Sequence, residues 1–473
     1  MNEVNWPKID SDHLMVYSKQ MLEFENDIFS RGMPVESLME KVGITISDWL
    51  VERKDLLKDG ITVIIGPGHN GGDGAVVARE LFLKGYQVKV WCPFPINKNL
   101  TKTHLNYITS IGVQNLGKVP ELNKSDLWVD AIFGNNQKRA CDVKLIELFN
   151  KKFDSQLGEI ISIDVPTGLC PDSGKPFLDI AVKANHTLSI GLKKIGIIQD
   201  DAIPYVGKIH DIDIGISSNQ LINLKKKKLV VCKNDYAGLN FSLPPQNASK
   251  YKRGRTLLIA GSEKYPGAAS LVIKGALASG VGSISLLVPE RIAKSIWQIS
   301  PEAVTKGILN SSSSGESLIY KSLKKIDLSF YESVLIGPGI GIDVSDWERS
   351  SQILVNFQGT LVIDADALNR IAESEMGTQF FKERKFKTFI TPHKAEFRRL
   401  FPDLREINNV ELAIKAADEF NLSILLKGAN SVIADKLLAW QLFKTDADSA
   451  RAGFGDLLAG FIAGMTAFEL ASG

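Results

Sequence analysis

The stretch ITVIIGPGHNGGDG, residues 61–74, decides the architecture that we expect for the first half of the chain. Its first five residues form a short, β-branched apolar run that ends in glycine, which is typical of a buried parallel strand. A helical stretch follows at residues 75–83, and a second strand follows at residues 87–91. Strands that alternate with helices predict a mostly parallel sheet covered on both faces.

The same alternation continues through the chain. Short apolar runs typical of strands recur at residues 127–129, 159–163, 186–190, 256–259, 283–288, 333–336, 360–363, 388–390 and 423–426. A helix is predicted before the first strand. Pro34 suits the first turn of a helix, and the apolar residues after it recur at helical spacing: Leu38, Val42, Ile46 and Trp49. We therefore expect an α/β protein with two three-layer αβα domains, residues 1–223 and 232–473, joined by a basic linker at 224–231.

Composition and charge exclude several classes of protein. The 56 Lys and Arg residues nearly balance 54 Asp and Glu residues, so we expect neither a nucleic-acid partner nor a membrane partner. Four scattered cysteines without a CxxC pair argue against a disulfide framework or a zinc site. The first five residues lack the features of a signal peptide, and the apolar run at 457–470 is interpreted as a buried helix. We expect a cytoplasmic protein.

The glycine-rich stretch that follows the first strand has two interpretations. Residues 66–71 match G-x-G-x-x-G, which by itself suggests a dinucleotide-binding turn. Residues 88–93, at the end of the second strand, lack the acidic residue expected to bind the ribose. The glycines could serve only as tight-turn residues. We favour the alternative, in which they expose backbone N–H groups and the side chains of Asn70 and Asp73 to a ligand.

Carboxylates also follow two further predicted strands. Asp130 and Asp164 each stand at a strand end, and Thr167 follows shortly after. In parallel sheets, ligands bind outside the carboxyl ends of the strands, so we expect these residues to meet Asn70 and Asp73 on one rim. Any single aspartate there could simply cap a helix. Several together favour a hard cation held by oxygen ligands, and Asp164 could transfer protons.

These segments carry a resemblance to a known family. Residues 66–74, 129–134 and 163–168, with Leu38-Met39-Glu40, resemble the Rossmann-like YjeF N-terminal domain, the NAD(P)H-hydrate epimerase. The resemblance implies that K⁺ is bound by Asn70, Asp130 and Thr167, and that Asp164 is the catalytic acid. It also implies a substrate site formed by His69, Asn70, Gly71, Gly72, Asp73, Gly134, Asn135, Asn136, Gln137, Lys138, Arg139, Ala140 and Asp164. His69 and residues 135–137 depart from the usual pattern of the family.

The end of the second half of the sequence contains a motif suited to a different reaction, the transfer of a phosphoryl group. Residues 452–456 form a glycine-rich turn that opens a helix, with Asp456 in its first turn. Helix N-terminal amides stabilise anions, and an aspartate there can accept a proton from an attacking hydroxyl. Asp456 alone could be an ordinary helix cap. No G-x-x-x-x-G-K-[ST] motif occurs in the sequence, which argues against a P-loop mechanism.

Asp456 belongs to a larger set of strand-end motifs. Together with residues 261–268, 337–341, 364–369, 391–396 and 426–431, it resembles the ribokinase-like ADP/ATP-dependent NAD(P)H-hydrate dehydratase. The resemblance implies that the hydrated nucleotide contacts Ala268, Gly341, His393 and Asp456, with Asp456 as catalytic base. It places ADP or ATP, with Mg²⁺, at Lys427, Gly428, Ala429, Asn430, Ser431 and Gly455. His393 by itself could equally be a core or cap histidine, and Lys394-Ala395 replaces a Pro-Gly pair of the family.

The two resemblances together predict a bifunctional enzyme that repairs hydrated NADH and NADPH. Its small-molecule partners would be the hydrates, NADHX and NADPHX, and an adenine nucleotide. The residues do not decide ADP against ATP, and they leave a homo-oligomer open. The alternative is a vitamin-pathway kinase of ribokinase-like fold joined to a non-catalytic nucleotide-binding module.

The last helix carries one further expectation. Members of the resembled family usually continue beyond the point where this sequence ends, at Gly473. We therefore expect poor cover for the apolar face of this helix, and hence a less stable second domain. The residues concerned are Leu457, Leu458, Phe461, Ile462, Met465 and Phe468.

Overall fold

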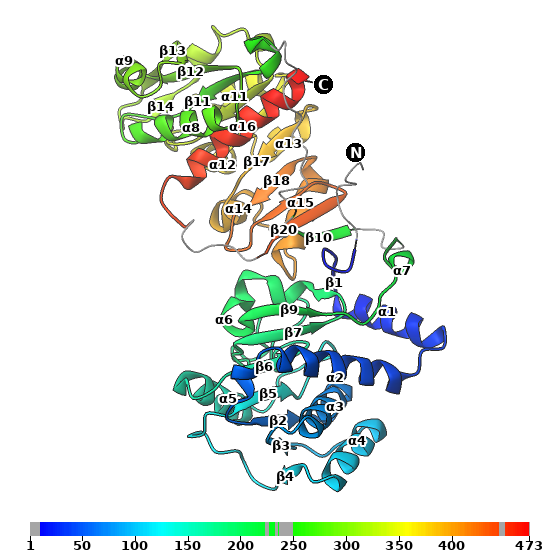
Figure 1. Cartoon of the computed structure of the whole chain (residues 1–473). Coiled ribbons are helices and arrows are strands. Elements are labelled where there is room, and N and C mark those ends of the chain that lie inside the picture. The colour runs from blue at the N-terminus through cyan, green and yellow to red at the C-terminus, as the bar shows by residue number, and fades with distance from the viewer. Residues whose placement is uncertain (1–9, 223–226, 232–234, 236–248, 444–449, 473) are drawn as a thin grey trace. The chain divides into compact units, whose positions relative to one another are not determined.

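The computed structural model describes residues 10–222, 227–231, 235, 249–443 and 450–472, and the chain divides into two compact α/β units between Val230 and Val231 (Figure 1). The expected linker 224–231 includes a strand, β10 (Lys227–Val231). The N-terminal residues 1–5, residues 224–226 and Cys232, on which the sequence also led to expectations, lie outside the described residues.

The first unit contains a seven-stranded sheet in which every neighbouring pair is parallel. Its order is β4 (Gln114–Leu116), β3 (Val88–Trp91), β2 (Ile61–Ile65), β5 (Leu127–Ala131), β6 (Ile160–Ile163), β7 (His186–Ile190) and β9 (Lys208–Ile212). Its longer helices are α1 (Ser18–Ser30), α2 (Val35–Val51), α3 (His69–Leu83), α4 (Asn99–Ser110) and α5 (Val143–Ser155). The strand order reverses between β2 and β5, where crossovers to opposite faces open a crevice for ligands.

Three of the glycines after β2 serve close packing rather than exposing their backbone to a ligand, although Asn70 and Asp73 of the same stretch do line a cavity as expected. Helix α3 begins at His69, so Gly71, Gly72 and Gly74 already lie inside it and are buried. A Cβ atom on Gly71 would stand 2.1 Å from the carbonyl oxygen of Gly66, and one on Gly74 would stand 2.5 Å from Cβ of Ala131. These glycines therefore let α3 approach the sheet more closely than any other residue would allow.

A small second sheet joins the start of the first unit to a segment far along the chain. Strand β1 (Met15–Val16) pairs in parallel with β8 (Lys193–Lys194). Since β1 leads directly into α1, this pairing places α1 next to the residues that follow β7. The sequence patterns predicted neither of these two-residue strands.

The second unit contains ten strands of a mixed sheet. Their order is β20 (Leu438–Leu442), β19 (Val432–Ala434), β18 (Ser423–Leu426), β17 (Thr388–Ile390), β16 (Thr360–Ile363), β15 (Ser333–Ile336), β11 (Arg255–Ile259), β12 (Ser283–Pro289), β13 (Ala303–Ser311) and β14 (Ser317–Leu318). The strands from β18 to β13 in this order are parallel, and β14, β19 and β20 pair antiparallel. Its longer helices are α8 (Pro266–Ala278), α11 (Trp347–Val355), α12 (Asp366–Glu373), α15 (Asn409–Phe420) and α16 (Phe454–Ser472).

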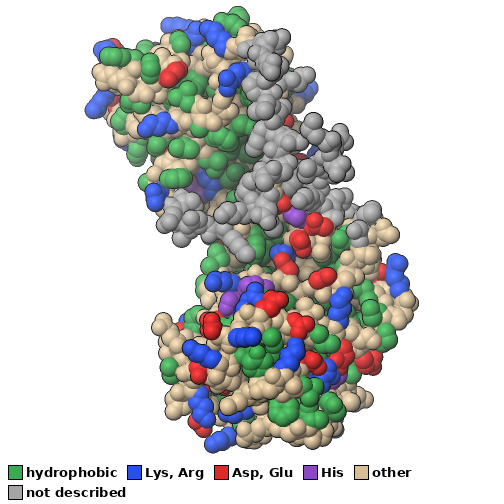
Figure 2. All heavy atoms as spheres, viewed as in Figure 1, with side chains coloured by type: hydrophobic (Ala, Val, Ile, Leu, Met, Phe, Trp, Pro, Cys, Tyr) green, Lys and Arg blue, Asp and Glu red, His purple; other side chains and the backbone are tan. Residues whose placement is uncertain are grey.

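The two units differ in the charged side chains on the face drawn in Figure 2. On this face, Lys and Arg side chains are interspersed with Asp and Glu side chains over the first unit, whereas the described part of the second unit shows mainly Lys and Arg with few Asp and Glu. The formal net charge of the whole chain is +2.

The last helix, α16, packs against α8 and lies across β11, β15 and β16. Its buried face consists of small residues, because Ala459, Gly460, Ala463, Gly464 and Ala467 are all buried. By length and composition alone it could cross a membrane, with a mean hydropathy of 1.4 over an 18-residue stretch of which 33% is buried. Of the apolar residues expected to lack cover, Phe468 is buried, whereas five are half-buried: Leu457, Leu458, Phe461, Ile462 and Met465.

The contact between α8 and α16 requires glycine at one position. A Cβ atom on Gly275 would stand 1.9 Å from the backbone carbonyl oxygen of Leu457, which cannot move independently of α16. We predict that Gly275→Ala separates the two helices and lowers the stability of the second unit by about 1–3 kcal/mol. Thermal unfolding of the full chain, followed by calorimetry, measures this change.

A matched variant exists on the same helix. Gly267 has no neighbouring atom within 4 Å of its Cβ position, so Gly267→Ala should leave the melting temperature unchanged or slightly raised. Equal melting temperatures for the two variants would show that the close helix contact does not limit stability.

Candidate active sites

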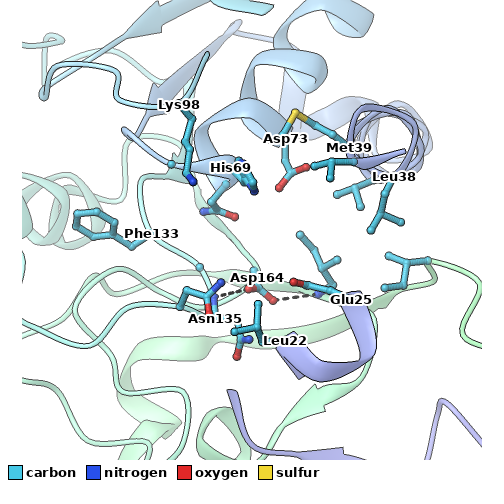
Figure 3. Close-up of a pocket in the computed structure, with 18 of the residues that line it drawn as sticks. Leu22, Glu25, Leu38, Met39, His69, Asp73, Lys98, Phe133, Asn135 and Asp164 are labelled. Atoms are coloured by element: carbon cyan, nitrogen blue, oxygen red, sulfur yellow. Dashed lines mark hydrogen bonds between the residues drawn. The ribbon is translucent and has the colours of Figure 1, made fainter. Parts of the chain in front are cut away.

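A cavity of about 520 Å³ in the first unit is lined by residues that follow β2, β5 and β6, beside the point where the strand order reverses. Figure 3 shows His69, Asp73, Asn135 and Asp164 around this space. Eight of the expected substrate-binding residues line it: His69, Asn70, Asp73, Gly134, Asn135, Asn136, Gln137 and Asp164. Of the five residues expected to converge from the strand ends, Asn70, Asp73 and Asp164 line the cavity, whereas Asp130 and Thr167 are not among the described residues that line it.

The other five expected substrate contacts are not among the described residues that line this cavity. Gly71 and Gly72 are buried in the packing of α3, and a Cβ atom on Gly72 would stand 2.5 Å from the sulfur of Met39. Lys138 and Arg139 are exposed, and Ala140 is half-buried. Contact between these five residues and a bound substrate stays a prediction.

Asp164 is held at the cavity wall in an unusual backbone conformation. Its φ is 71°, in the left-handed region that non-glycine residues other than Asn and Asp seldom adopt. One carboxylate oxygen forms an ion pair with the buried Lys194 and accepts a hydrogen bond of 3.3 Å from the backbone N–H of Ile190. The other accepts a hydrogen bond of 2.5 Å from the backbone N–H of Asn135. The position of this carboxylate is therefore fixed by three groups.

Two neighbouring amides in the cavity wall differ in their hydrogen bonds. Asn135 donates from Nδ2 to the carbonyl of Ser18 over 3.1 Å, but its buried Oδ1 has no partner among the described residues. Gln137 uses both ends of its amide on the backbone, at the carbonyl of Pro166 (3.1 Å) and the N–H of Gly168 (2.8 Å). Asn135 thus retains an acceptor for a ligand, whereas Gln137 supports the turn after β6.

The three residues expected to bind K⁺ differ in their surroundings. Asp130 is fully buried and accepts hydrogen bonds from the hydroxyl of Thr167 (2.7 Å), the N–H of Thr167 (2.8 Å) and the hydroxyl of Ser162 (3.0 Å). Among the described residues, no basic side chain forms an ion pair with it, and burial raises the pKa of its carboxyl. Asn70 donates to the carbonyl of Ile163 over 3.3 Å.

A buried carboxylate without a basic partner fits a cation. The hydroxyl of Thr167 donates to Asp130 and accepts from the N–H of Phe133, so one lone pair remains for an ion. Asn70 donates through its nitrogen, which leaves its amide oxygen available. Oxygen donors of this kind suit a hard cation such as K⁺.

Three charged residues at or beside the cavity were not predicted from the sequence. Glu25, on α1, and Lys98 line the cavity, and Lys194 forms the ion pair with Asp164. Burial and the neighbouring Asp164 raise the pKa of Glu25 to about 7, although Lys194 opposes this. Burial, with Asp164 and Glu25, also raises the pKa of Asp73 well above its usual range. The run Lys193-Lys194 directly after a buried strand was the available signal for Lys194, and nothing in the pattern around Glu25 pointed to the site.

In the second unit, the carboxyl ends of β16 and β18 meet the start of α16. Lys427 Nζ lies 2.8 Å from Oδ1 of the buried Asp364. The Cβ position of Gly455 lies 3.5 Å from the same Nζ atom, so Lys427 reaches the first turn of α16. Burial and Asp364 raise the pKa of Asp456 to about 6, Lys427 lowers it, and Asp366 raises it further. Asp456, Lys427 and Gly455 are therefore brought together as expected.

The glycine loop after β15 is joined to the same cluster. Asp366 accepts a hydrogen bond of 2.8 Å from the N–H of Gly341, and the buried Arg370 donates 2.8 Å to the carbonyl of Gly341. The Cβ position of Gly339 lies 2.6 Å from Cβ of Ala268 at the start of α8. Gly341 and Ala268, two of the expected substrate contacts, thus lie on neighbouring loops.

His393 is a helix cap, which was one of its two expected roles. Its Nδ1 accepts hydrogen bonds from the N–H groups of Ala395 (3.1 Å) and Glu396 (3.3 Å), at the start of α14 (Lys394–Leu400). Its side chain is 49% exposed, and its backbone bridges to Lys427. Its Nε2 lies 3.3 Å from Oε1 of Glu396, and contact with a ligand stays a prediction.

The segment expected to bind the adenine nucleotide forms the turn between β18 and β19. The hydroxyl of Ser431 donates to the carbonyl of Gly428 over 3.0 Å, and the N–H of Lys427 donates to the carbonyl of Pro392 over 2.8 Å. Asn430 is buried, and its carbonyl accepts from Gln441 over 3.3 Å. The turn is thereby fixed next to the strand end that carries Lys427.

Comparisons with known proteins agree with this division. The family model described as YjeF-related protein N-terminus matches residues 35–196, and the one described as NAD(P)H-hydrate dehydratase matches residues 256–473. A bifunctional NAD(P)H-hydrate repair enzyme of Synechocystis is 36% identical over 97% of this chain and 87% of its own length.

Two solved structures are similar to the second half. One is an ADP/ATP-dependent NAD(P)H-hydrate dehydratase of Bacillus subtilis, co-crystallised with ATP/Mg²⁺, at 26% identity over 49% of this chain and 80% of that chain, with a TM-score of 0.39. The other is a ribokinase-like superfamily protein of Enterococcus faecalis. It is 22% identical over 49% of this chain and 75% of that chain, with a TM-score of 0.41. The expected α/β class with two units is confirmed by the two large sheets and the helices between their strands. The chain belongs to the family of bifunctional NAD(P)H-hydrate repair enzymes, which combine NAD(P)H-hydrate epimerase and ADP/ATP-dependent NAD(P)H-hydrate dehydratase activities.

Proposed function

We propose that the cavity of the first unit is the epimerase site and that the cluster around Asp456 is the dehydratase site. The first site interconverts the R and S forms of hydrated NADH and NADPH. The second consumes the S form with ADP or ATP, restores NADH or NADPH, and releases AMP or ADP and phosphate. We assign residues 1–223 to the epimerase domain and 232–473 to the dehydratase domain of a cytoplasmic enzyme.

The observation that carries the dehydratase assignment is the position of Asp456. It stands in the first turn of a long helix, next to Lys427 and two further carboxyls, with its pKa raised to about 6. A carboxylate with such a pKa accepts a proton more readily than an ordinary aspartate does and is still ionised at neutral pH. Asp456 would take the proton of the substrate hydroxyl as that oxygen attacks the terminal phosphoryl group. Phosphate then leaves far more easily than hydroxide, and the double bond of the ring is restored.

The chain provides the groups that would hold the nucleotide. The amides at the start of α16, with Gly455, face developing negative charge on the transferred phosphoryl group. Lys427 adds a positive charge beside them. Mg²⁺ bound with the nucleotide would neutralise phosphate charge, and the acidic side chains nearest to the site are Asp364 and Asp366.

In the first unit, we propose that Asp164 exchanges a proton with the substrate and that K⁺ is held by Asn70, Asp130 and Thr167. The ion would compensate the buried charge of Asp130 and thereby stabilise the turn after β6 that carries Thr167. Asn135, with its unpartnered oxygen, would orient a donor group of the nicotinamide ring.

The first prediction concerns the base of the dehydratase. Asp456→Asn removes the proton acceptor, so we expect dehydration of the S form to fall by 10²-fold or more while exchange of the two epimers continues. Recovery of NADH absorbance from the S form measures dehydration. Asp403→Asn, which changes an exposed aspartate of the same unit, should leave the rate unchanged.

The same assignment predicts a pH dependence. Only ionised Asp456 can accept the proton, so the wild-type dehydration rate should fall about tenfold per pH unit below about pH 6 and be level above it. A rate that stays constant down to pH 5 would remove Asp456 from the role of base.

A second prediction separates the two activities. Asn tolerates the left-handed conformation of residue 164, so Asp164→Asn should preserve the backbone while it removes the negative charge. We expect rapid repair of the S form, whereas the R form is repaired only at the rate of uncatalysed exchange. Dehydration of the S form in the same sample is the internal control for folding, and equally fast repair of both forms would exclude Asp164 from the mechanism.

A third prediction tests the cation. Replacing K⁺ by a large organic cation should slow epimerisation and leave dehydration of the S form unchanged, because the proposed ligands lie only in the first unit. The melting temperature of that unit should also rise with added K⁺, since an ion bound only by the folded state stabilises it. With Asp130→Asn, which removes the buried charge, the response of the melting temperature to K⁺ should disappear.

A further inference from the structure

Helix α1 brings a carboxyl group to the epimerase cavity from outside the parallel sheet. Glu25 lines the cavity, and Figure 3 shows it close to Asp164. The start of the helix is fixed by two hydrogen bonds from Ser18 to Asp172, each of 2.7 Å, and by the bond from Asn135 to the carbonyl of Ser18. The buried Met21 anchors the same helix one turn before Glu25. Glu25 is therefore presented on a fixed element.

The charges around Glu25 are unequal in number. Three carboxyls, those of Glu25, Asp73 and Asp164, line the cavity, as does one lysine, Lys98. A second lysine, Lys194, forms an ion pair with Asp164. None of the described residues donates a hydrogen bond to the carboxyl of Glu25. Burial and Asp164 disfavour its charged form, which raises its pKa to about 7. At neutral pH, Glu25 can therefore both hold and release a proton.

Several titratable or charged groups face Glu25 from the elements around the cavity. Asp164 and Lys194 belong to the segments after β6 and β7, and Asp73 and His69 belong to α3. Lys98 precedes α4 and lies near His69, whose pKa it lowers together with burial. Burial and Asp164 raise the pKa of Glu25, and Lys194 lowers it.

The reaction itself requires two proton transfers. Hydration of a dihydronicotinamide ring is addition of water to an enamine, so the hydroxyl-bearing carbon is bonded to the ring nitrogen. Exchange of configuration at that carbon can proceed by loss of the hydroxyl and addition of water to the other face. Loss requires a proton on the departing oxygen, and addition requires that the entering water give up a proton.

We propose that Glu25 is a second proton-transfer residue of the epimerase, which protonates the departing hydroxyl while Asp164 accepts the proton of the entering water. This inference rests on the assignment of the cavity as the epimerase site. For the opposite epimer the two carboxyls exchange roles, as reversibility demands.

The atoms and electrons balance with water as the only co-reactant. The C–O bond breaks with its electron pair on oxygen, which takes the proton of Glu25 and leaves as water. The lone pair of the ring nitrogen forms a C=N bond, and a second water adds to that carbon and returns the pair to nitrogen. The new oxygen loses one proton to Asp164, and proton exchange between the two neighbouring carboxyls, directly or through water, restores the starting state.

The test uses the full chain with mixed hydrate epimers, K⁺, Mg²⁺ and ADP or ATP. Dehydration consumes the S form first, so the slow phase of NADH recovery reports epimerisation. We expect Glu25→Gln to slow this phase by 10²-fold or more and to leave the fast phase unchanged. Glu25→Asp should restore part of the rate. Glu23→Gln, at an exposed position on the same helix that does not line the cavity, is the matched control and should resemble the wild type.

The pH profile distinguishes proton transfer from a merely structural role. Wild-type epimerisation should lose rate above about pH 7, where Glu25 no longer holds a proton, and this limb should be absent from the residual rate of Glu25→Gln. Water enriched in ¹⁸O should label the hydroxyl during catalysed exchange.

Each remaining outcome identifies what has failed. If the wild type does not accelerate the slow phase, the epimerase assignment of the cavity is wrong. If the wild type does so and Glu25→Gln has the same rate and pH profile, only the role of Glu25 is refuted. A slowed Glu25→Gln variant with an unchanged profile and a lowered melting temperature would also refute proton transfer by Glu25.

Discussion

The ion pair between Lys194 and Asp164 organises the first unit around its cavity. Both side chains are almost completely buried, and a buried charge of either sign is stable only with its partner. Lys194 lies on β8, whose pairing with β1 determines where α1 begins. Asp164 in turn fixes the backbone of Asn135 and adopts a strained φ of 71° to do so. One electrostatic contact therefore links the end of β6, the loop after β5 and the N-terminal helix.

The two units share one arrangement of charged side chains. In each, a lysine neutralises one strand-end carboxylate: Lys194 pairs with Asp164, and Lys427 pairs with Asp364. In each, a second carboxyl stands nearby, and burial together with the first carboxylate raises its pKa: Glu25 to about 7 and Asp456 to about 6. The second carboxyl is therefore able to exchange a proton near neutral pH.

The sequence predicted the helices and strands whose apolar residues form a regular pattern. It did not predict the strands that form only by pairing with a segment far away in the sequence. Strands such as Ile61–Ile65 are buried along their whole length, so their apolar runs were visible in the sequence. The convergence of Asp164 with Asn70 and Asp73 followed from the parallel sheet. Strands β1 and β8 have two residues each and exist only through their mutual pairing. The site residues that depend on that pairing, Lys194 and Glu25, could not be located from local pattern. Helix α3 was expected to begin after the glycines, because their role in close packing becomes apparent only in three dimensions.

The raised pKa of Glu25 has a consequence for stability as well as for catalysis. The folded state holds the proton more tightly than an unfolded chain, in which the pKa is about 4.5, so the folded state is relatively favoured below that pH and loses this advantage as the pH rises through about 7. At neutral pH the unpaired carboxyls of the cavity therefore lower the free energy of unfolding. A lysine paired with Glu25 would remove this effect, but it would also hold Glu25 ionised. Among the described residues Lys194 forms its ion pair with Asp164 instead, and this arrangement leaves a proton available on Glu25.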